Sequence, residues 1–274
     1  MLGLAETRVC SSPFLRWAGG KRWLVEHSAE IFNLEFDRLV EPFLGGGAVF
    51  FATQPSSAYL SDLNSELIFT YIEIRDNWEE VLKFLKIHNR SHTKDYYYKI
   101  RNSNPRKMAS RAAKFIYLNR TCFNGLYRVN KEGKFNVPLG SKTEVILPND
   151  NFKKLSLALQ TATLKVQDFS DTLSQVKYGD LVFVDPPYTI KHNLNGFLKY
   201  NESIFSWADQ IRLRDCLIEA ANAGAKIIMT NADHECIRSL YAGCGSFEVL
   251  CRPSLISGRA EGRGLYSELI VRIN

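Results

Sequence analysis

The sequence has no long hydrophobic run, no closely paired cysteines and no large excess of charge of either sign. A membrane-spanning helix needs about 18 or more consecutive apolar residues, and no stretch of the 274 residues approaches that length. The 35 lysines and arginines against 29 acidic residues leave a net charge of +6. This small positive charge is compatible with binding to a polyanion such as a nucleic acid, but it is too small to indicate one. We therefore expect a soluble protein whose function is indicated by its motifs.

Neither a disulfide framework nor a metal centre is expected. The six cysteines are scattered without a Cys-x-x-Cys pair, which is typical of reduced thiols. One histidine and three cysteines near the C-terminus can be grouped as zinc ligands: His234, Cys236, Cys244 and Cys251. Their spacings match no common zinc-binding pattern, so we interpret them as ordinary buried residues. Residues 1–13 lack the apolar core of a secretion signal, which predicts a cytoplasmic protein.

The order of apolar runs predicts an α/β fold. The chain contains no internal repeat, low-complexity tract or long linker. Short apolar runs predict strands at 38–40, 58–60, 164–166, 181–184, 226–229 and 269–271. A helix is predicted over 207–223, because Ser206 and Asp209 have capping-box spacing and Gly224 is a C-terminal stop signal. Strands that alternate with helices favour a mostly parallel sheet covered by helices.

Residues 67–140 interrupt this alternation and predict an inserted, mainly helical module within a body formed by 1–66 and 141–274. Helical patterns in the module lie at 67–74, 78–88 and 109–119. The segment 119–130 mixes Arg and Asn with Phe, Leu and Tyr, a combination suited to base edges and base stacks. An aromatic loop packed on the core is the alternative interpretation of that segment.

The tetrapeptide Asp185-Pro186-Pro187-Tyr188 directly follows the apolar run 181–184. Two prolines end the strand and leave a carboxylate, a carbonyl and an aromatic ring at the carboxyl end of the sheet, where α/β folds bind ligands. The amine N6 of adenine is a poor nucleophile, because its lone pair is delocalised into the ring. Asp185 and the Pro186 carbonyl can accept hydrogen bonds from the two N–H groups of N6. These bonds would favour a tetrahedral, nucleophilic nitrogen and stabilise the positive charge that develops on it during attack. Tyr188 can stack on the base. A simple strand-ending turn is the alternative.

A strand, a glycine turn and the start of a helix are predicted over 40–51, with Gly45 and Gly47 in the turn. Phe50 stands where a dinucleotide fingerprint needs its third glycine, which argues against a pyrophosphate-bearing NAD or FAD. Asp62 follows the next strand and is placed to bind a ribose hydroxyl pair, to cap the following helix, or to do both. These features favour a ribose-bearing cofactor.

Two shorter motifs lie near the ends of this body. A Gly-Lys pair ending at Lys21 suggests a phosphate-binding loop, but Leu15 stands where that motif needs its first glycine and Arg22 follows the lysine. A loop of that type is therefore excluded. Asp168 and Phe169 follow the run 164–166 and offer a carboxylate and a ring to an adenine moiety at the same sheet edge.

In this order, the motifs resemble those of the Dam-like DNA adenine-N6 methyltransferases, from Phe14 to Val271. The matching segments are Phe-Leu-Arg-Trp-Ala-Gly-Gly-Lys at 14–21, Glu-Pro-Phe-Leu-Gly-Gly-Gly at 41–47, Asp62, Phe-Asn-Gly-Leu-Tyr-Arg at 123–128, Phe-Asn-Val-Pro-Leu-Gly at 135–140, Asp168-Phe169 and Asp-Pro-Pro-Tyr at 185–188. The resemblance implies a Rossmann-like methyltransferase that uses S-adenosylmethionine (AdoMet), flips an adenine out of double-stranded DNA and methylates N6. It further implies GATC as the target sequence. We expect a monomer, without a metal or a membrane partner.

The resemblance also implies roles for individual residues. Residues 1–66 and 141–274 would form the catalytic AdoMet-binding domain, and 67–140 the target-recognition insertion with its hairpin. The catalytic group comprises Asp185, Pro186 and Tyr188. The residues implied in AdoMet binding are Trp17, Gly19, Lys21, Phe43, Gly45, Gly47, Asp62, Leu63, Asp168, Phe169 and Asp185. The residues implied in DNA binding are Arg16, Arg120, Phe123, Asn124, Leu126, Arg128, Asn136 and Pro138.

Within the DNA-binding set, Phe123 would intercalate and Asn124 would lie at the orphaned thymine. Arg16 and Arg128 are chemically fitted to guanine, because an arginine can pair bidentately with its O6 and N7. Two loops rich in Ser, Gly and Arg, 189–200 and 254–266, either close over DNA or cofactor or are solvated.

Two other functions stay open at this point. An AdoMet-dependent enzyme that acts on an amine in RNA or protein would explain the Asp-Pro-Pro-Tyr loop but not the hairpin segment. A DNA-binding regulator on a catalytically silent methyltransferase fold would explain the hairpin segment but not the intact Asp185 and Tyr188.

Overall fold

The computed structural model describes residues 12–130, 132–189, 205–253 and 265–274. Most of the two loops predicted to close over DNA or cofactor lies outside these residues. The chain divides into two compact units. Unit 1 takes its described residues from Met1–Glu35, Leu44–Ala58 and Asn64–Val166, and unit 2 takes them from Phe36–Phe43, Tyr59–Leu63 and Gln167–Asn274.

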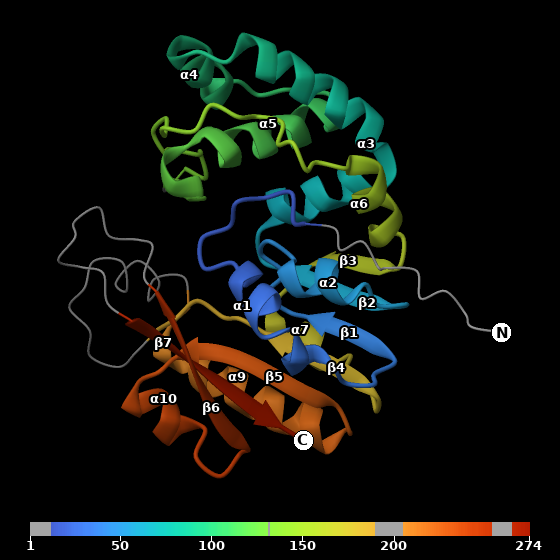
Figure 1. Ribbon diagram of the computed structural model, residues 1–274, viewed down its shortest axis with the longest axis vertical. Coiled ribbons are helices and arrows are strands. Elements are labelled where there is room, and N and C mark those ends of the chain that lie inside the picture. The colour runs from blue at the N-terminus through green and yellow to red at the C-terminus, as the bar shows by residue number, and fades with distance from the viewer. Residues whose placement is uncertain (1–11, 131, 190–204, 254–264) are drawn as a thin grey trace. The chain divides into compact units, whose positions relative to one another are not determined.

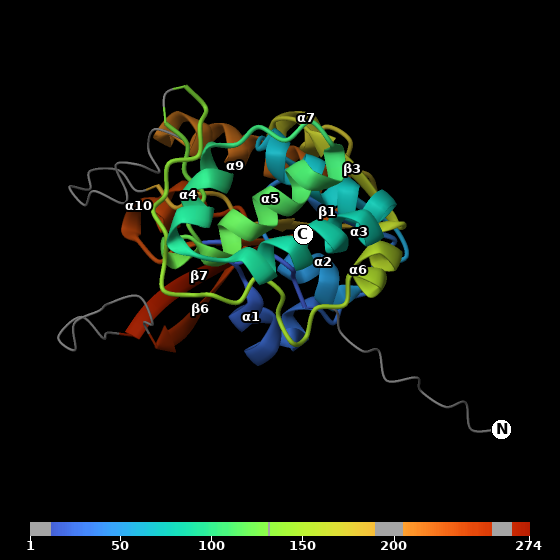
Figure 2. The same ribbon diagram turned by 90° about the horizontal axis from the view of Figure 1, so that it is seen from above.

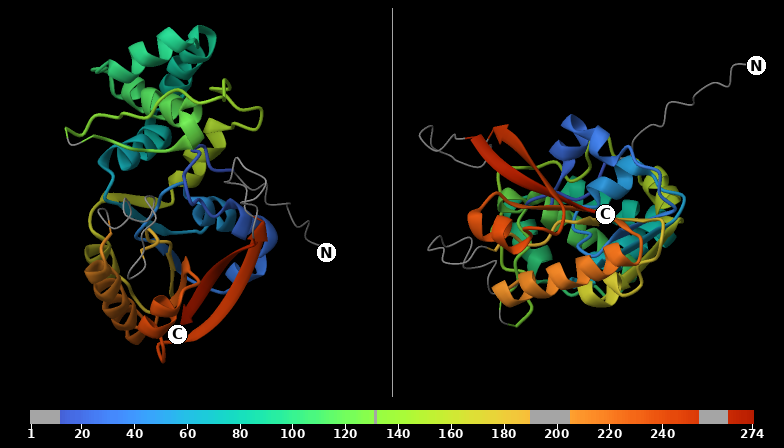
Figure 3. Two further views of the ribbon diagram at one scale, coloured as in Figure 1. Left: turned by 90° about the vertical axis from the view of Figure 1, so that its left-hand side faces the viewer. Right: turned by 90° about the horizontal axis from the view of Figure 1, so that it is seen from below.

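Seven described strands form one sheet in the order β3-β2-β1-β4-β5-β7-β6. Their bounds are β1 Arg38–Glu41, β2 Ala58–Asp62, β3 Ala162–Val166, β4 Asp180–Val184, β5 Lys226–Ala232, β6 Ser246–Pro253 and β7 Leu265–Ile273. β4 runs parallel to β1 and β5, with Leu181 opposite Leu39 and Val182 opposite Ile227. β7 runs antiparallel to β5 and to β6. The paired strands β6 and β7 are the two red arrows that lie side by side in Figure 3. The predicted α/β fold with a mostly parallel sheet is confirmed.

Unit 2 buries its central strands on both faces. All five residues of β4 are buried, as a non-alternating apolar run predicts. Helix α9 (Trp207–Asn222) packs Leu213 into the apolar cluster that contains Ile227. Its capping box is present, because Ser206 and Asp209 each accept a hydrogen bond from the other's backbone N–H. The shorter helices of this unit are α7 (Phe169–Leu173) and α10 (Glu235–Leu240).

Unit 1 is mainly helical (Figure 2). Its helices are α1 Arg22–His27, α2 Ala48–Thr53, α3 Ser65–Ser91, α4 Lys94–Asn102, α5 Met108–Thr121 and α6 Phe152–Leu159, with the 3-10 turns η1 Ala29–Phe32 and η2 Phe123–Gly125. α3 packs against α5 and α6 (Figures 1 and 2). The helices predicted over 67–74 and 78–88 both lie within α3, and the non-helical backbone of Asn77 (φ −137°, ψ 30°) separates them.

Several described elements lie outside the predictions: the helices α1, α4, α6, α7 and α10, the two 3-10 turns, and the strand β6. α4 is rich in tyrosine and charged residues, so its helix depends on packing of the fully buried Tyr97. β6 is an edge strand that pairs with β7 alone. No described helix is long and apolar enough to cross a membrane. The predicted division by function, with 67–140 as the recognition module, stays a prediction.

Candidate functional site

The carboxylate of Asp185 lies in unit 2, directly after the buried strand β4. Thr230 on the neighbouring strand β5 is fully buried, and its Oγ1 donates a hydrogen bond of 2.8 Å to Oδ1 of Asp185. The parallel register, with Val184 opposite Met229, brings the two residues together. Asp185 is therefore held in one orientation at the carboxyl edge of the sheet, where α/β folds bind ligands.

A second contact orients the aromatic residue of the same loop. The hydroxyl of Tyr188 donates to Oε2 of Glu268 at 3.2 Å. Glu268 lies on β7 and is only 2% exposed. The next residue, Thr189, donates from Oγ1 to the Phe205 carbonyl at 2.6 Å. The loop after β4 is thus fixed by side chains from β5 and β7.

The predicted cofactor residues of unit 2 also gather at the carboxyl ends of strands. β1 ends at Glu41, and its parallel register with β4 places Phe43 at the same edge as Asp185. The Phe43 ring stacks on Phe169 with centroids 5.5 Å apart and meets Phe205 edge-on at 5.6 Å. Phe169 is 2% exposed, whereas Phe43 is partly exposed. Phe43 is therefore the ring of this cluster that is open to a ligand, and Phe169 supports it.

Asp168 begins α7 and is firmly held. Its Oδ1 accepts from the Ser170 backbone N–H at 2.9 Å, and Arg212 donates to both of its oxygens at 2.7 and 3.1 Å. Burial raises the pKa of Asp168, but hydrogen bonds from Arg212 and Ser170 outweigh burial and hold the pKa below its usual value. At neutral pH this side chain is an ionised acceptor.

The end of β2 presents Asp62 and Leu63 in unit 2. Leu63 is 63% exposed. The alternative role of Asp62 as the cap of the following helix is wrong, because Asn64 caps α3 and accepts from the Leu67 N–H at 3.1 Å. The ribose contact of Asp62 stays a prediction.

The predicted cofactor residues of unit 1 form a tight turn against an indole ring. Gly45 has φ +47°, and a Cβ at this position would lie 2.9 Å from Cδ1 of Trp17, so only glycine fits. The Tyr71 hydroxyl donates to the Gly45 carbonyl at 3.1 Å. Lys21 is 3% exposed, and its Nζ donates to the Gly19 carbonyl at 2.9 Å. Gly47 has φ +64° and precedes α2.

Residues 122–139 of unit 1 form an antiparallel hairpin. Its strands are joined by the bridges Cys122–Leu139 and Val129–Phe135. The Phe123 N–H donates to the Pro138 carbonyl at 2.9 Å. These bridges give the segment the backbone pairing of a hairpin, and its role in target recognition stays a prediction.

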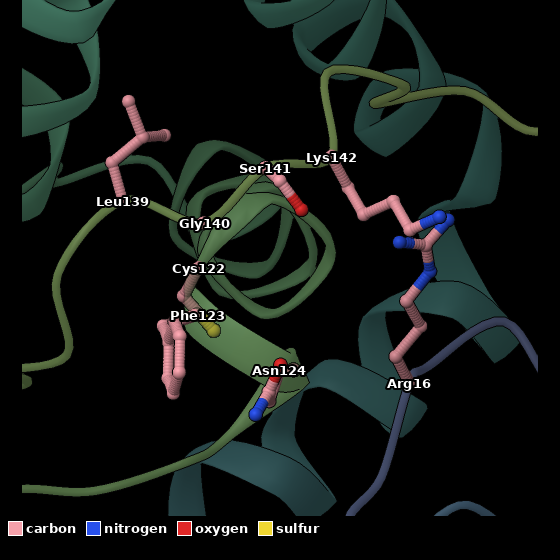
Figure 4. A pocket seen from close by; sticks show the side chains of 9 residues that line it. Arg16, Cys122, Phe123, Asn124, Leu139, Gly140, Ser141 and Lys142 are labelled. Atoms are coloured by element: carbon pink, nitrogen blue, oxygen red, sulfur yellow. The ribbon is translucent and has the colours of Figure 1, made fainter. Parts of the chain in front are cut away.

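A hollow of about 650 Å³ lies at the base of this hairpin. It is lined by Arg16, Cys122, Phe123, Asn124, Gly125, Leu139, Gly140, Ser141 and Lys142 (Figure 4). The structure thus brings Arg16 together with Phe123 and Asn124, more than a hundred residues later in the chain. Phe123 is 51% exposed, although it is a large aromatic residue. Burial raises the pKa of the Cys122 thiol to about 12, so this wall of the hollow carries no negative charge at neutral pH.

Four other predicted DNA-binding residues lie farther along the hairpin. Nε of Arg128 donates to Oδ1 of Asn136 at 2.8 Å across the two strands. This contact orients an exposed guanidinium. Leu126 is partly buried and Pro138 is exposed.

Arg120 does not belong to this surface. It is fully buried, its Nη2 donates to the Phe14 carbonyl at 2.7 Å, and its Nη1 donates to the Val145 carbonyl at 2.7 Å. Its guanidinium also forms an ion pair with Asp150. A side chain with no exposed surface cannot reach a base edge, so the prediction that Arg120 contacts DNA is wrong. Arg120 instead holds two backbone segments to the end of α5.

The interpretation of His234, Cys236, Cys244 and Cys251 as ordinary buried residues is wrong, because His234 and Cys251 are exposed and Cys236 and Cys244 are partly exposed. His234 caps α10, where its Nδ1 accepts from the Cys236 N–H at 3.2 Å. Among the described residues, no three His, Cys, Asp or Glu side chains gather as a metal site.

Comparison with known proteins shows the family to which these motifs belong. The model of the D12 class N6 adenine-specific DNA methyltransferase family matches residues 17–252. The type II methyltransferase M1.LlaDCHI of Lactococcus lactis subsp. cremoris is 34% identical over 98% of this chain and 97% of its own. The type II methyltransferase M.MjaIII of Methanocaldococcus jannaschii is 32% identical, over 94% and 98% of the two chains. The DNA adenine methylase of Serratia marcescens is 30% identical, over 94% and 96%.

The chain belongs to the D12 class of N6 adenine-specific DNA methyltransferases. It is therefore an enzyme that methylates adenine in DNA, and the family match spans both the hairpin and the Asp-Pro-Pro-Tyr loop. The alternatives of an RNA or protein acceptor and of a silent regulator are not favoured.

Two residues that hold the loop of this methyltransferase escaped the sequence analysis, Thr230 and Glu268. They lie 45 and 80 residues after Asp185 and Tyr188, their respective partners. No local motif marks either of them. Only the adjacency of β4, β5 and β7 reveals their role, although a polar residue within an apolar strand is a usable signal in both cases.

Proposed function

We propose that this methyltransferase transfers the methyl group of AdoMet to N6 of an adenine that is flipped out of duplex DNA, within the sequence GATC. The observation that carries the proposal is the carboxylate of Asp185, fixed by Thr230 at the carboxyl edge of the sheet. The proposal assigns the methyl donor, the state of the base and the target sequence.

The chemistry at the loop follows from the properties of the amine. Asp185 and the Pro186 carbonyl accept hydrogen bonds from the two N–H groups of N6. This favours a tetrahedral nitrogen whose lone pair is directed at the methyl group. AdoMet supplies an electrophilic methyl group on a sulfonium. As the bond from N6 to the methyl carbon forms and the carbon–sulfur bond breaks, S-adenosylhomocysteine would leave and positive charge would grow on N6. The Asp185 carboxylate would stabilise this charge until N6 loses its extra proton to solvent. Tyr188 stacks on the extruded base, with its ring oriented through Glu268.

The residues at the strand ends of unit 2 fit the parts of AdoMet. The partly exposed Phe43 and the exposed Leu63 offer apolar surface to the adenine ring. Asp168, kept ionised by Arg212, accepts from the adenine amine. Asp62 accepts from the ribose hydroxyls, as the acidic residue of nucleotide-binding α/β folds does. The roles of Trp17, Gly19, Lys21, Gly45 and Gly47 in unit 1 are proposed from the resemblance.

The hairpin of unit 1 fits DNA recognition. Phe123 projects an exposed ring suited to insertion between base pairs, and Asn124 beside it offers donors and an acceptor to the unpaired thymine. Arg16 and Arg128 present guanidinium groups to guanines, while Leu126 and Pro138 contact the groove. Extrusion of the adenine is required, because in-line attack on the methyl group cannot take place inside the base stack.

Methyl transfer to short duplexes tests donor and target together. Tritiated AdoMet is incubated with duplexes that contain GATC or GTTC, at one stated salt concentration because phosphate contacts dominate affinity. Label on the GATC duplex alone supports the proposal, whereas equal label on both contradicts the target sequence. With 2-aminopurine in place of the target adenine, a rise in fluorescence on binding supports flipping, and no rise contradicts it.

A further inference from the structure

Asn119, in the last turn of α5, makes three hydrogen bonds to backbone groups of two other segments. Its Oδ1 accepts from the Arg16 N–H at 2.8 Å, and its Nδ2 donates to the Arg16 carbonyl at 2.7 Å. The same Nδ2 donates to the Gly125 carbonyl at 3.3 Å. Asn119 is 1% exposed, so water cannot replace these bonds. One amide therefore satisfies both polar backbone groups of Arg16 and ties them to the hairpin.

The joined segments are in close contact. Gly125 has φ +64°, and a Cβ there would lie 3.0 Å from both Cβ and the carbonyl oxygen of Arg16. Gly125 directly follows Phe123 and Asn124, which line the same hollow as Arg16 (Figure 4). The Arg16 side chain extends toward Lys142 from a segment with no regular secondary structure. The guanidinium itself has weaker contacts: Nη1 donates to the Arg120 carbonyl at 3.4 Å, and Nη2 lies 4.0 Å from Oε2 of Glu144. Asn119 fixes the backbone from which this side chain extends.

We propose that Asn119 is a positioning residue for target recognition: it sets the place of Arg16 relative to Phe123 and Asn124. The inference rests on the proposed function, in which these three side chains contact DNA. Asn119 itself lies beneath the surface and touches no base. Its effect on the choice of site passes through Arg16, because discrimination between bases requires contacting groups placed to within about 0.5 Å.

Two substitutions of Asn119 distinguish the contribution of its Nδ2 donor from that of its Oδ1 acceptor. Asn119→Asp keeps the shape and the Oδ1 acceptor but removes both Nδ2 donors, and Asn119→Ser shortens the side chain beyond reach. Ser156→Ala is the matched control in unit 1, because Ser156 is buried and its Oγ donates to the Arg75 carbonyl at 2.6 Å on other helices. The measured quantity is the ratio of kcat/KM on GATC to kcat/KM on a duplex altered at the base pair that depends on Arg16, identified with Arg16→Ala.

We expect both Asn119 variants to lower this ratio about tenfold, and Ser156→Ala to leave it unchanged although it lowers Tm. In the double variant Arg16→Ala/Asn119→Asp, we expect a ratio within about twofold of Arg16→Ala alone, because residues that act as a unit are not additive. Circular dichroism verifies folding, and Asn119→Ser decides the outcome if Asn119→Asp does not fold.

Two results overturn the inference, and they are distinguishable. If Arg16→Ala lowers the ratio but the Asn119 variants keep it, Asn119 has only a structural role. If Arg16→Ala changes the ratio at no base pair, the proposed DNA contact of Arg16 is wrong, and the inference fails with it.

Discussion

The hydroxyl of Thr230 donates a 2.8 Å hydrogen bond to the carboxylate of Asp185, from a buried position on the neighbouring strand. We expect Thr230→Val, which keeps the shape but removes the donor, to lower the single-turnover rate of methyl transfer about tenfold. A hydrogen bond to a charged group contributes about 1.5–3 kcal/mol, and about 1.4 kcal/mol changes a rate tenfold. Thr230→Ser restores the donor and should restore most of the rate. An unchanged rate in Thr230→Val would show that orientation of Asp185 does not depend on this bond.

Tyr188 and Glu268 provide a second test of the loop. Tyr188→Phe keeps the ring that stacks on the base but loses the hydrogen bond to Glu268, so we expect a drop in kcat of less than about fivefold. Tyr188→Ala removes the stack, which is worth about 1–3 kcal/mol per base, and should lower both kcat and kcat/KM by about five- to 150-fold. If Tyr188→Phe and Tyr188→Ala have equal kcat values, stacking of the Tyr188 ring on the base does not contribute to catalysis.

The buried ion pair between Arg120 and Asp150 predicts a stability effect without a direct DNA effect. Arg120→Met leaves the Asp150 carboxylate buried without its partner, and we expect it to lower the free energy of unfolding by about 3–5 kcal/mol. Urea unfolding measures the loss. The salt dependence of DNA binding by the folded fraction should keep the wild-type slope, because a phosphate contact contributes about one unit to it. If the slope of log K against log salt concentration is smaller by about one unit in the variant, Arg120 does contact a DNA phosphate.

His88 predicts how stability depends on pH. It is 6% exposed and stacks on Tyr117, and burial lowers its pKa from 6.5 to about 4. The unfolded chain takes up this proton below about pH 6.5 and the folded chain only near pH 4, so stability is complete above pH 6.5 and falls as the pH is lowered through this window. The loss reaches about 3 kcal/mol. His88→Phe should flatten the profile between pH 6.5 and 4 in urea unfolding, and an unchanged profile would assign the dependence to other groups.

The agreement between sequence and structure depends on how local each signal is. The buried strand β4 and the capped helix α9 follow from runs of adjacent residues, and both are found where they were predicted. α4 was missed because its helix depends on Tyr97, which donates to the Val137 carbonyl of the hairpin at 3.0 Å. Such a contact between distant segments leaves no periodic pattern.

The same reasoning explains which parts of the site were found. Asp185 and Phe123 stand in short motifs, whereas Thr230, Glu268 and Asn119 act from elements that only the fold brings near their partners. Arg120 was misassigned for the converse reason. An arginine beside a recognition segment resembles a DNA contact in sequence, and only its burial against Phe14 and Val145 shows otherwise.

Single-turnover methyl transfer by Asp185→Ala tests whether Asp185 activates the adenine amine. Wild-type protein and the variant are incubated with a GATC duplex and labelled AdoMet, and N6-methyladenine is quantified while fluorescence anisotropy follows DNA binding. We expect Asp185→Ala to bind the duplex as the wild type does but to form no N6-methyladenine above background. Methyl transfer at the wild-type rate would contradict activation of the adenine amine by Asp185.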